Sequence, residues 1–183
     1  MRVITGTARG TLLAAPNGLD TRPTGDKVKE SIYSIIQFDV PGARVLDLFA
    51  GSGQLGIEAL SRGAESAVFV EKNPIAVKCI VSNLEKTKLT EGATVVKQHA
   101  LSFLQTTGHM FDIALLDPPY MSSNLNEALP LLAEHMSPQG IILCETCEEH
   151  EMPESFENFS LKKEYRYGKT KLYLYTVREG NKE

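Results

Sequence analysis

Apolar positions follow two alternating spacings along most of the chain. Short apolar runs, typical of buried parallel strands, occupy 43–49, 65–71, 93–98, 111–116 and 141–145. Between these runs, apolar residues recur every three or four positions, a spacing that predicts helices over about 54–62, 74–88, 101–106 and 125–135. Repeated strand–helix units of this kind predict an α/β fold, a mostly parallel sheet with helices on both faces.

The two ends of the chain depart from this alternation. Residues 1–25 are rich in glycine and proline, which predicts a loop-rich arm with a short hairpin of Arg2–Thr5 and Thr11–Ala14. A helix is expected from residue 26, where isoleucines recur at helical spacing. Near the other end, 161–167 and 171–177 have the pattern of two strands joined by a tight turn, an antiparallel hairpin.

Length and composition favour one globular domain of 183 residues, with 42% apolar and 23% charged residues. We divide it into an arm and helix, 1–42, and a core, 43–183. The chain has no apolar run of the roughly 20 residues that a membrane helix needs, and its beginning lacks a signal-peptide pattern. Three cysteines form no disulfide framework. We therefore expect a cytoplasmic protein, a monomer by default, without membrane contact.

A glycine-rich turn follows the first strand of the core. Val45–Phe49 is an apolar strand that carries one charge, Asp47, and Gly51-Ser52-Gly53 then leads into a helix. Glycines let a backbone approach a ligand closely, and a helix N-terminus offers free N–H groups. Glu71 ends the next strand about 20 residues later, where a carboxylate binds the two hydroxyls of a ribose. The pattern predicts a site for a nucleotide cofactor.

A second motif, Asp117-Pro118-Pro119-Tyr120, follows the strand 111–116 directly. Ligands of such sheets bind beyond the carboxyl ends of the strands, so this motif and the glycine turn are expected in one cleft. A carboxylate and a backbone carbonyl that accept the two N–H bonds of an exocyclic base amine make its nitrogen lone pair more available. The prolines fix the backbone and donate no N–H, and an aromatic ring stacks on an unpaired base.

The chain resembles the bacterial 16S ribosomal RNA guanine-N2 methyltransferase family, the small-subunit methyltransferase D type, whose fold is Rossmann-like. The acidic-Pro-Pro-aromatic motif and the glycine loop are shared by many class I methyltransferases that use S-adenosylmethionine. More distinctive stretches extend the resemblance to nearly the whole chain: Arg2-Val3-Ile4-Thr5-Gly6, Arg9-Gly10, Arg22-Pro23-Thr24, Lys29-Glu30-Ser31-Ile32-Tyr33 and the run from Leu46 to Ala64. Class I methyltransferases also end in an antiparallel hairpin, and the resemblance implies a seven-stranded sheet.

The resemblance implies roles for individual residues. The cofactor S-adenosylmethionine would contact Asp47, Ala50, Gly51, Ser52, Gly53, Glu71, Lys72, His99 and Ala100. The target amine would be held by Asp117, Pro118, Pro119 and Tyr120, and no metal is implied. The partner, 16S ribosomal RNA within the small subunit or an assembly intermediate, would contact Arg2, Arg9, Arg22, Thr24 and Lys29. Two positions depart from the family pattern: Lys29 replaces an arginine, and His99 replaces an acidic residue that contacts the adenine.

The charge distribution leaves the RNA partner open. The net charge of −4 argues against a protein that coats nucleic acid, yet residues 1–36 carry +2 and the remainder −6. A second basic stretch, 162–178, holds six lysines and arginines against one glutamate. Each patch either faces a phosphate backbone or is a solvated surface.

Other functions remain open on the same residues. The Asp-Pro-Pro-Tyr motif also suits an adenine-N6 methyltransferase or a glutamine-amide methyltransferase, although Asp117 and the basic arm favour nucleic acid. A nicotinamide-dependent oxidoreductase would use the glycine turn but leaves the second motif unexplained. A non-enzymatic RNA-binding module would be indifferent to loss of Asp117. Cys144 and Cys147 have metal-site spacing, but without a second pair we interpret them as structural thiols.

Overall fold

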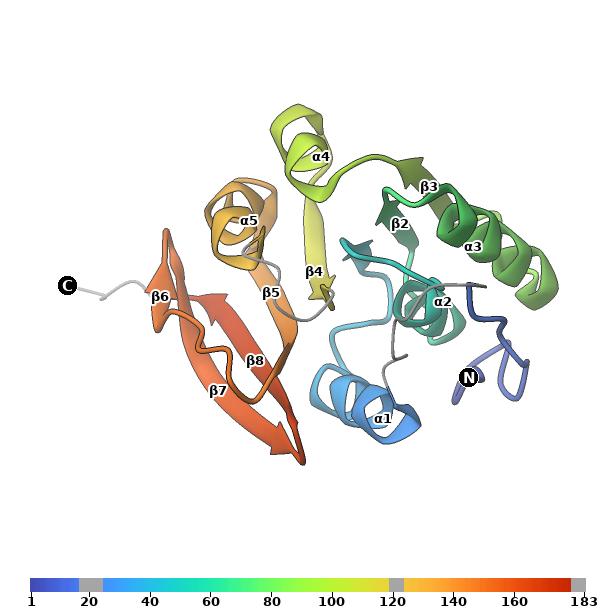
Figure 1. Cartoon of the computed structure of the whole chain (residues 1–183), viewed down its shortest axis with the longest axis horizontal. Coiled ribbons are helices and arrows are strands. Elements are labelled where there is room, and N and C mark those ends of the chain that lie inside the picture. Colours follow the sequence, from blue (N-terminus) through green and yellow to red (C-terminus); the bar gives the residue numbers. More distant parts are fainter. Residues whose placement is uncertain (17–24, 119–123, 179–183) are drawn as a thin grey trace.

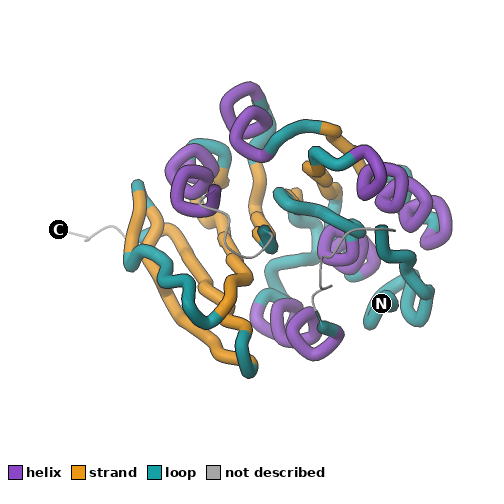
Figure 2. Tube along the Cα trace, in the orientation of Figure 1, coloured by secondary structure: helices purple, strands orange, loops and turns teal. Residues whose placement is uncertain are grey.

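The computed structural model describes residues 1–16, 25–118 and 124–178, which form one eight-stranded sheet flanked by helices (Figures 1 and 2). The helices are α1 (Asp26–Ile35), α2 (Gln54–Ser61), α3 (Pro74–Thr87), α4 (Ala100–Thr106) and α5 (Asn124–Ala133). The strands are β1 (Arg44–Asp47), β2 (Ser66–Glu71), β3 (Ala93–Lys97), β4 (Phe111–Leu116), β5 (Met136–Cys147), β6 (Ser155–Phe156), β7 (Phe159–Tyr167) and β8 (Thr170–Val177).

The strands lie in the order β3-β2-β1-β4-β5-β8-β7-β6. The first five are mutually parallel, and β8 runs antiparallel between β5 and β7. The predicted parallel core and C-terminal hairpin are therefore confirmed. The strand order reverses direction between β1 and β4, and the crevice at such a point is where open α/β sheets bind their ligands.

Helices cover both faces of the sheet, as the strand–helix alternation predicts. α1, α2 and α3 lie on one face, and α4 and α5 lie on the other (Figure 1). The side chains between each layer and the sheet form two buried apolar clusters, one around Tyr33, Phe69 and Leu115, the other around Phe103 and Leu129. Successive residues of a strand belong to opposite clusters. This alternation determines which side chains near the end of each strand are directed towards α1.

Two local predictions differ from the structure. The strand predicted over 141–145, after a turn signal in Pro138-Gln139-Gly140, is longer in the structure: β5 already begins at Met136, which pairs with Phe111. An irregularity in the pairing opposite, between Phe111 and Ile113, accommodates this stretch within the strand. The sheet has eight strands rather than seven, because the two-residue β6 pairs with the outer edge of β7.

The N-terminal arm, residues 1–16, packs against the core. Its predicted hairpin is reduced to one antiparallel bridge between Arg2 and Leu12. Val3, Ala8 and Leu13 are buried in the cluster beneath α1, α2 and α3. At Gly6 the backbone has a φ of +87°, and a Cβ atom there would lie 1.7 Å from the carbonyl oxygen of Ser61, so only glycine permits this approach.

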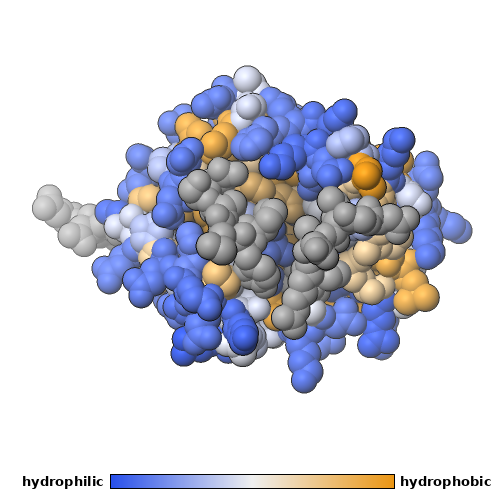
Figure 3. Space-filling view, in the orientation of Figure 1, coloured by the Kyte–Doolittle hydropathy of each residue, from blue (hydrophilic) through white to orange (hydrophobic). Residues whose placement is uncertain are grey.

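The described surface is mostly polar. Figure 3 shows hydrophilic residues over much of the face in view, with a hydrophobic area over the N-terminal arm. Leu12, in that arm, is 64% exposed. Within 1–16, 25–118 and 124–178, no helix combines the length and the apolar character needed to span a bilayer.

Candidate active site

The glycine loop between β1 and α2 is fixed by hydrogen bonds to β2, to β4 and within the loop itself. Ala50 N–H donates to the Val70 carbonyl of β2 at 3.1 Å, and Leu48 N–H donates to the Leu115 carbonyl of β4 at 3.1 Å. The loop then closes on itself where Gly53 N–H donates to the Ala50 carbonyl at 2.6 Å. The loop is therefore fixed at the carboxyl ends of three adjacent parallel strands.

Gly53 is required both by its backbone conformation and by its neighbours. It caps α2 in the left-handed region, with a φ of +76°. A Cβ atom there would lie 3.2 Å from Ile80 of α3 and 3.4 Å from Phe69 of β2. A side chain at this position would strain the loop and push it away from the strands.

Glu71 accepts hydrogen bonds with both carboxylate oxygens, one from the glycine loop and one from the residue before α3. Oε2 accepts from Gly51 N–H at 3.0 Å, and Oε1 accepts from Asn73 N–H at 2.8 Å. The end of β2 is thereby joined to the loop and to the start of α3. An ionised carboxylate has about four acceptor positions, so Glu71 retains capacity to accept from two ligand hydroxyls.

Asp47 lies beneath the same loop and is 1% exposed. Its Oδ2 accepts from Gly56 N–H, in the first turn of α2, at 2.9 Å. The pKa of Asp47 is raised to about 7, chiefly by burial; the Gly56 hydrogen bond opposes this rise, and the charges of Asp117 and Glu71 contribute to it. Three carboxylates thus share one electronegative crevice, and a cation in it is stabilised.

Asp117 and Pro118 follow β4 at the same edge of the sheet. Asp117 is half-buried and Pro118 is buried. The register pairs Leu115 with Asp47 and Leu116 with Cys144, so the motif begins beside β1 on one side and β5 on the other. The other two residues of the motif, Pro119 and Tyr120, lie outside the described residues.

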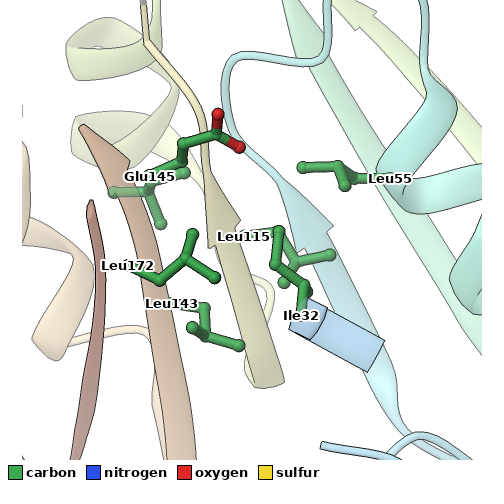
Figure 4. Close-up of a pocket in the computed structure, with 7 residues that line it drawn as sticks. Ile32, Leu55, Leu115, Leu143, Glu145 and Leu172 are labelled. Atoms are coloured by element: carbon green, nitrogen blue, oxygen red, sulfur yellow. The ribbon is translucent and has the colours of Figure 1, made fainter. Parts of the chain in front are cut away.

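A narrow apolar recess adjoins this motif on the α1 face (Figure 4). Ile32 approaches it from α1 and Leu55 from α2, and the sheet supplies the remaining lining: Leu115, Leu116, Leu143, Glu145 and Leu172. It leaves no space for a water molecule. Its one charged side chain, Glu145, is 5% exposed and lies one residue past the β4–β5 register pair, level with Asp117.

The remaining predicted cofactor residues surround the ends of β2 and β3. Gln98 N–H donates to the Glu71 carbonyl at 3.1 Å, which brings the next residue, His99, close to Glu71. His99 is half-buried and precedes α4, Ala100 is buried and begins it, and Lys72 is exposed. The structure therefore places these residues around one edge, joined there by the backbone hydrogen bond between Gln98 and Glu71.

The predicted RNA-binding residues separate into three groups. Arg2 and Arg9 are exposed on the arm, and the Arg2 guanidinium lies 3.8 Å from the Asp26 carboxylate. Arg22 and Thr24 lie outside the described residues. Lys29 is 0% exposed, so its prediction as an RNA contact is corrected.

Lys29 belongs to a buried polar network that holds the arm. Its Nζ donates to the Arg2 carbonyl at 2.6 Å and lies 3.5 Å from Glu58 Oε2. Glu58, also fully buried, accepts from Ile4 N–H at 2.8 Å and Thr5 N–H at 3.0 Å, and from Arg62 Nε at 2.8 Å. The cation at position 29 therefore neutralises a carboxylate that binds arm backbone, a role that needs no forked guanidinium.

Two polar residues that organise the site, Glu58 and Asn83, were not among the residues predicted from the sequence. Both are buried on helices, and Asn83 occupies the same helical face as Ala76, Ile80 and Leu84. A polar residue within an apolar helical stripe is the signal that identifies such positions. Elsewhere, the described residues contain no group of three side chains suited to a metal ion, and Cys144 is a buried thiol.

The donors and acceptors at this edge fit S-adenosylmethionine. The left-handed Gly53 brings backbone close to the crevice, Glu71 can accept from ribose hydroxyls, and the Asp47 carboxylate favours a cationic amino acid group. The fit rests on the loop geometry and the local charge.

Comparison with known proteins gives matches over almost the full length. A family model described as "Conserved hypothetical protein 95" matches residues 1–176. "Putative rRNA methyltransferase YlbH" of Bacillus subtilis is 41% identical over 183 residues, which cover 97% of this chain and all of that protein. "Ribosomal RNA small subunit methyltransferase D" of Escherichia coli is 34% identical over 177 residues, covering 96% and 89% of the two chains.

Solved structures agree with these matches. "Putative methyltransferase yhhF from Escherichia coli" superposes with a TM-score of 0.87 at 35% identity, covering 97% of this chain and 98% of that one. An RNA methyltransferase from Salinibacter ruber in complex with S-adenosylhomocysteine shares the fold, with a TM-score of 0.67 at 18% identity. The chain therefore belongs to the family described as conserved hypothetical protein 95, that of the ribosomal RNA small subunit methyltransferase D proteins, and has the class I methyltransferase fold.

Proposed function

We propose that the protein is an S-adenosylmethionine-dependent methyltransferase that acts on the exocyclic N2 amine of a guanine in 16S ribosomal RNA. One observation carries the proposal: Asp117 and Pro118 end β4 beside the glycine loop that ends β1, where the strand order reverses. An amine-binding motif and a nucleotide-binding loop therefore meet in one crevice. The related proteins named as ribosomal RNA methyltransferases support the choice of RNA.

S-adenosylmethionine, when bound, supplies the methyl group. The proposal assigns its ribose hydroxyls to Glu71 and its amino acid part to the glycine loop and Asp47. Lys72, His99 and Ala100 are assigned to the adenine side, because they follow β2 and β3 at the same edge. Glu71 also fixes Gly51, so one carboxylate both shapes the loop and binds the ligand.

Asp117 and Pro118 act on the target amine. The Asp117 carboxylate accepts one N–H of the amine, and the Pro118 carbonyl accepts the other. These two hydrogen bonds make the nitrogen lone pair, which is otherwise delocalised into the ring, more available for the new bond. As the N–C bond forms, the S–C bond of the sulfonium would break and leave the neutral thioether S-adenosylhomocysteine. The nitrogen gives up one proton, which the Asp117 carboxylate would accept and pass to water, and Asp117 stabilises the positive charge that develops. Tyr120 is proposed to stack on the base, and Pro119 to stiffen the backbone between them.

The neighbouring carboxylate of Glu145 supports guanine rather than adenine. Guanine presents N–H donors at both N1 and N2, whereas adenine presents an acceptor at N1 beside its amine. Ionised carboxylates only accept hydrogen bonds. Asp117, directly after β4, and Glu145, beside it within β5, therefore match a guanine edge better than an adenine edge.

The exposed arginines of the arm, Arg2 and Arg9, are proposed to contact RNA phosphates, together with Arg22 and Thr24. Their positive charge offsets the net negative charge of the rest of the chain. A phosphate contact contributes about 0.9 to the slope of log affinity against log salt concentration for a duplex, and about 0.7 for a single strand. Loss of Arg9 is therefore expected to reduce that slope by somewhat less than one.

The test is methyl transfer from labelled S-adenosylmethionine to small subunits, or their RNA, from a strain that lacks the gene. Digestion to nucleosides is expected to give label in N2-methylguanosine, and Asp117→Ala is expected to abolish it. Label in N6-methyladenosine would retain the mechanism and overturn the base. No label in RNA, despite measurable S-adenosylhomocysteine binding, would redirect the proposal to DNA or protein substrates.

A further inference from the structure

Asn83 of α3 joins the N-terminal arm to the glycine loop. Its side-chain Oδ1 accepts from Ala14 N–H at 2.8 Å, and its Nδ2 donates to the Ala14 carbonyl at 3.0 Å. The same Nδ2 donates to the Ser52 carbonyl at 2.9 Å. Asn83 is 1% exposed, so water is not available to replace these partners. One buried amide therefore binds two segments that are 38 positions apart in sequence.

A second contact joins the same two segments. Ser52 Oγ lies 3.6 Å from Met1 Sδ, and the Met1 carbonyl accepts from Leu13 N–H at 3.1 Å. The hydrogen bonds thus form a closed circuit from Ser52 through Asn83 to Ala14, and back along the arm to Met1. A displacement of Ser52 is transmitted to the arm along both routes.

Ser52 is placed where a bound cofactor would constrain it. It is the residue between Gly51, whose N–H Glu71 accepts, and Gly53, which caps α2 in the left-handed region. Its own backbone carbonyl is the one that Asn83 binds. A ligand that fixes the Gly51–Gly53 backbone therefore fixes the position of the Asn83 acceptor as well.

We propose that Asn83 is a positioning residue that couples occupancy of the glycine loop to the order of the N-terminal arm. The inference rests on the proposed function, in which the loop binds S-adenosylmethionine and the arm binds RNA. Coupling between two binding sites is reciprocal, so an arm held in place strengthens cofactor binding by the same factor by which cofactor strengthens the arm. RNA is then preferentially bound by the cofactor-loaded protein.

The first test is hydrogen exchange of the wild-type protein with and without saturating S-adenosylhomocysteine. Coupling predicts slower exchange at Ala14 and Leu13 N–H when ligand is bound, by about tenfold. Glu148 N–H, which donates to the Lys169 carbonyl beside the β7–β8 turn, serves as the internal control and is expected to change little. Unchanged exchange in the arm, with ligand demonstrably bound, would overturn the inference and leave the proposed function standing.

The second test compares Asn83→Ala with a matched control, Ser61→Ala. Ser61 also binds arm backbone, accepting from Ala8 N–H at 3.0 Å and donating to the Thr5 carbonyl at 2.6 Å, whereas the Ser52 carbonyl is bound by Asn83. Asn83→Ala is expected to raise the dissociation constant of S-adenosylhomocysteine about tenfold and to abolish the ligand effect on arm exchange. Ser61→Ala is expected to change that constant by less than twofold.

A merely structural role for Asn83 gives a different pattern. Both variants would then lower the melting temperature, and the remaining folded protein would bind ligand with the wild-type constant. Circular dichroism identifies any variant that does not fold, in which case the wild-type exchange experiment decides. If the wild-type protein does not bind S-adenosylhomocysteine at all, the proposed function is overturned, and the coupling with it.

Discussion

Replacing Lys29 by methionine separates its structural role from the predicted RNA contact. Methionine has a similar length and no charge, so the substitution removes the ammonium group and leaves the volume nearly unchanged. It leaves the Glu58 carboxylate, which is 0% exposed, without the cation at 3.5 Å. It also removes the donor that binds the Arg2 carbonyl.

The expected loss of stability follows from the burial of both charges. Breaking a buried ion pair costs about 3–5 kcal/mol, because one charge remains uncompensated. Glu58 keeps Arg62 at 2.8 Å and the two arm amides, so the lower end, about 3 kcal/mol, applies. For a protein of this length, that corresponds to a melting temperature lower by about 6–12 °C. Adding Glu58→Gln to Lys29→Met is expected to cost less than the sum of the single changes.

The assay pairs urea unfolding with RNA binding at several salt concentrations. Arg9→Met is the control, because Arg9 lies on the same arm but is exposed. Lys29→Met is expected to lower stability and to keep the salt slope of the folded protein, whereas Arg9→Met reduces the slope and keeps stability. A Lys29 variant of wild-type stability with a reduced salt slope would refute the structural assignment and restore the RNA contact.

Three further predictions concern the core and its titrating groups. The pKa of Asp47 is about 7, and its ionised form favours the ammonium group of the ligand's amino acid part. Affinity for S-adenosylhomocysteine is therefore expected to rise about tenfold from pH 6 to pH 8 by calorimetry; an equal rise in Asp47→Asn would contradict this. The Arg44 guanidinium holds the pKa of Asp112 at about 2, so Asp112→Asn costs about 1 kcal/mol after solvent screening at pH 5. The difference in stability from wild type should shrink as the pH falls below about 4 and disappear only below the folded-state pKa of about 2. Gly56→Ala would place Cβ 2.3 Å from Phe69 and is expected to lower stability by about 1–3 kcal/mol in thermal unfolding; wild-type stability in this variant would contradict the close packing of α2 on β2.

The sequence predicts the strands and helices of the α/β sheet well, because the signals for each element are local and repeated. Asn73-Pro74 shows this at the start of α3: the Asn73 side chain accepts from Ile75 N–H at 2.8 Å, and proline occupies the first helical turn. The hairpin turn at Gly168, with a φ of +61°, is equally local. Each such prediction depends on residues that are neighbours in sequence, so one chain is enough to make it.

Lys29 and residues 138–140 could not be predicted in this way, because their environment comes from distant segments. A lysine beside a glutamate on an amphipathic helix has the pattern of a solvated surface, and only the packing of Glu58 from α2 makes Lys29 a buried ion. Pro138 and Gly140 are strong turn signals, yet both lie within β5, which pairs with β4. In both cases tertiary contacts override a local preference.

The arm illustrates how buried polar groups specify geometry that apolar packing leaves loose. Val3, Ala8 and Leu13 bury apolar surface, but apolar contacts alone tolerate small shifts along the helices. Glu58, Ser61 and Asn83 instead accept from or donate to named arm amides and carbonyls, each at 3.0 Å or less. A shift of one residue would leave these buried groups without partners, at a cost of about 1–3 kcal/mol each. The position of the arm relative to the glycine loop is therefore set by hydrogen bonding, which is the condition that coupling between the two requires.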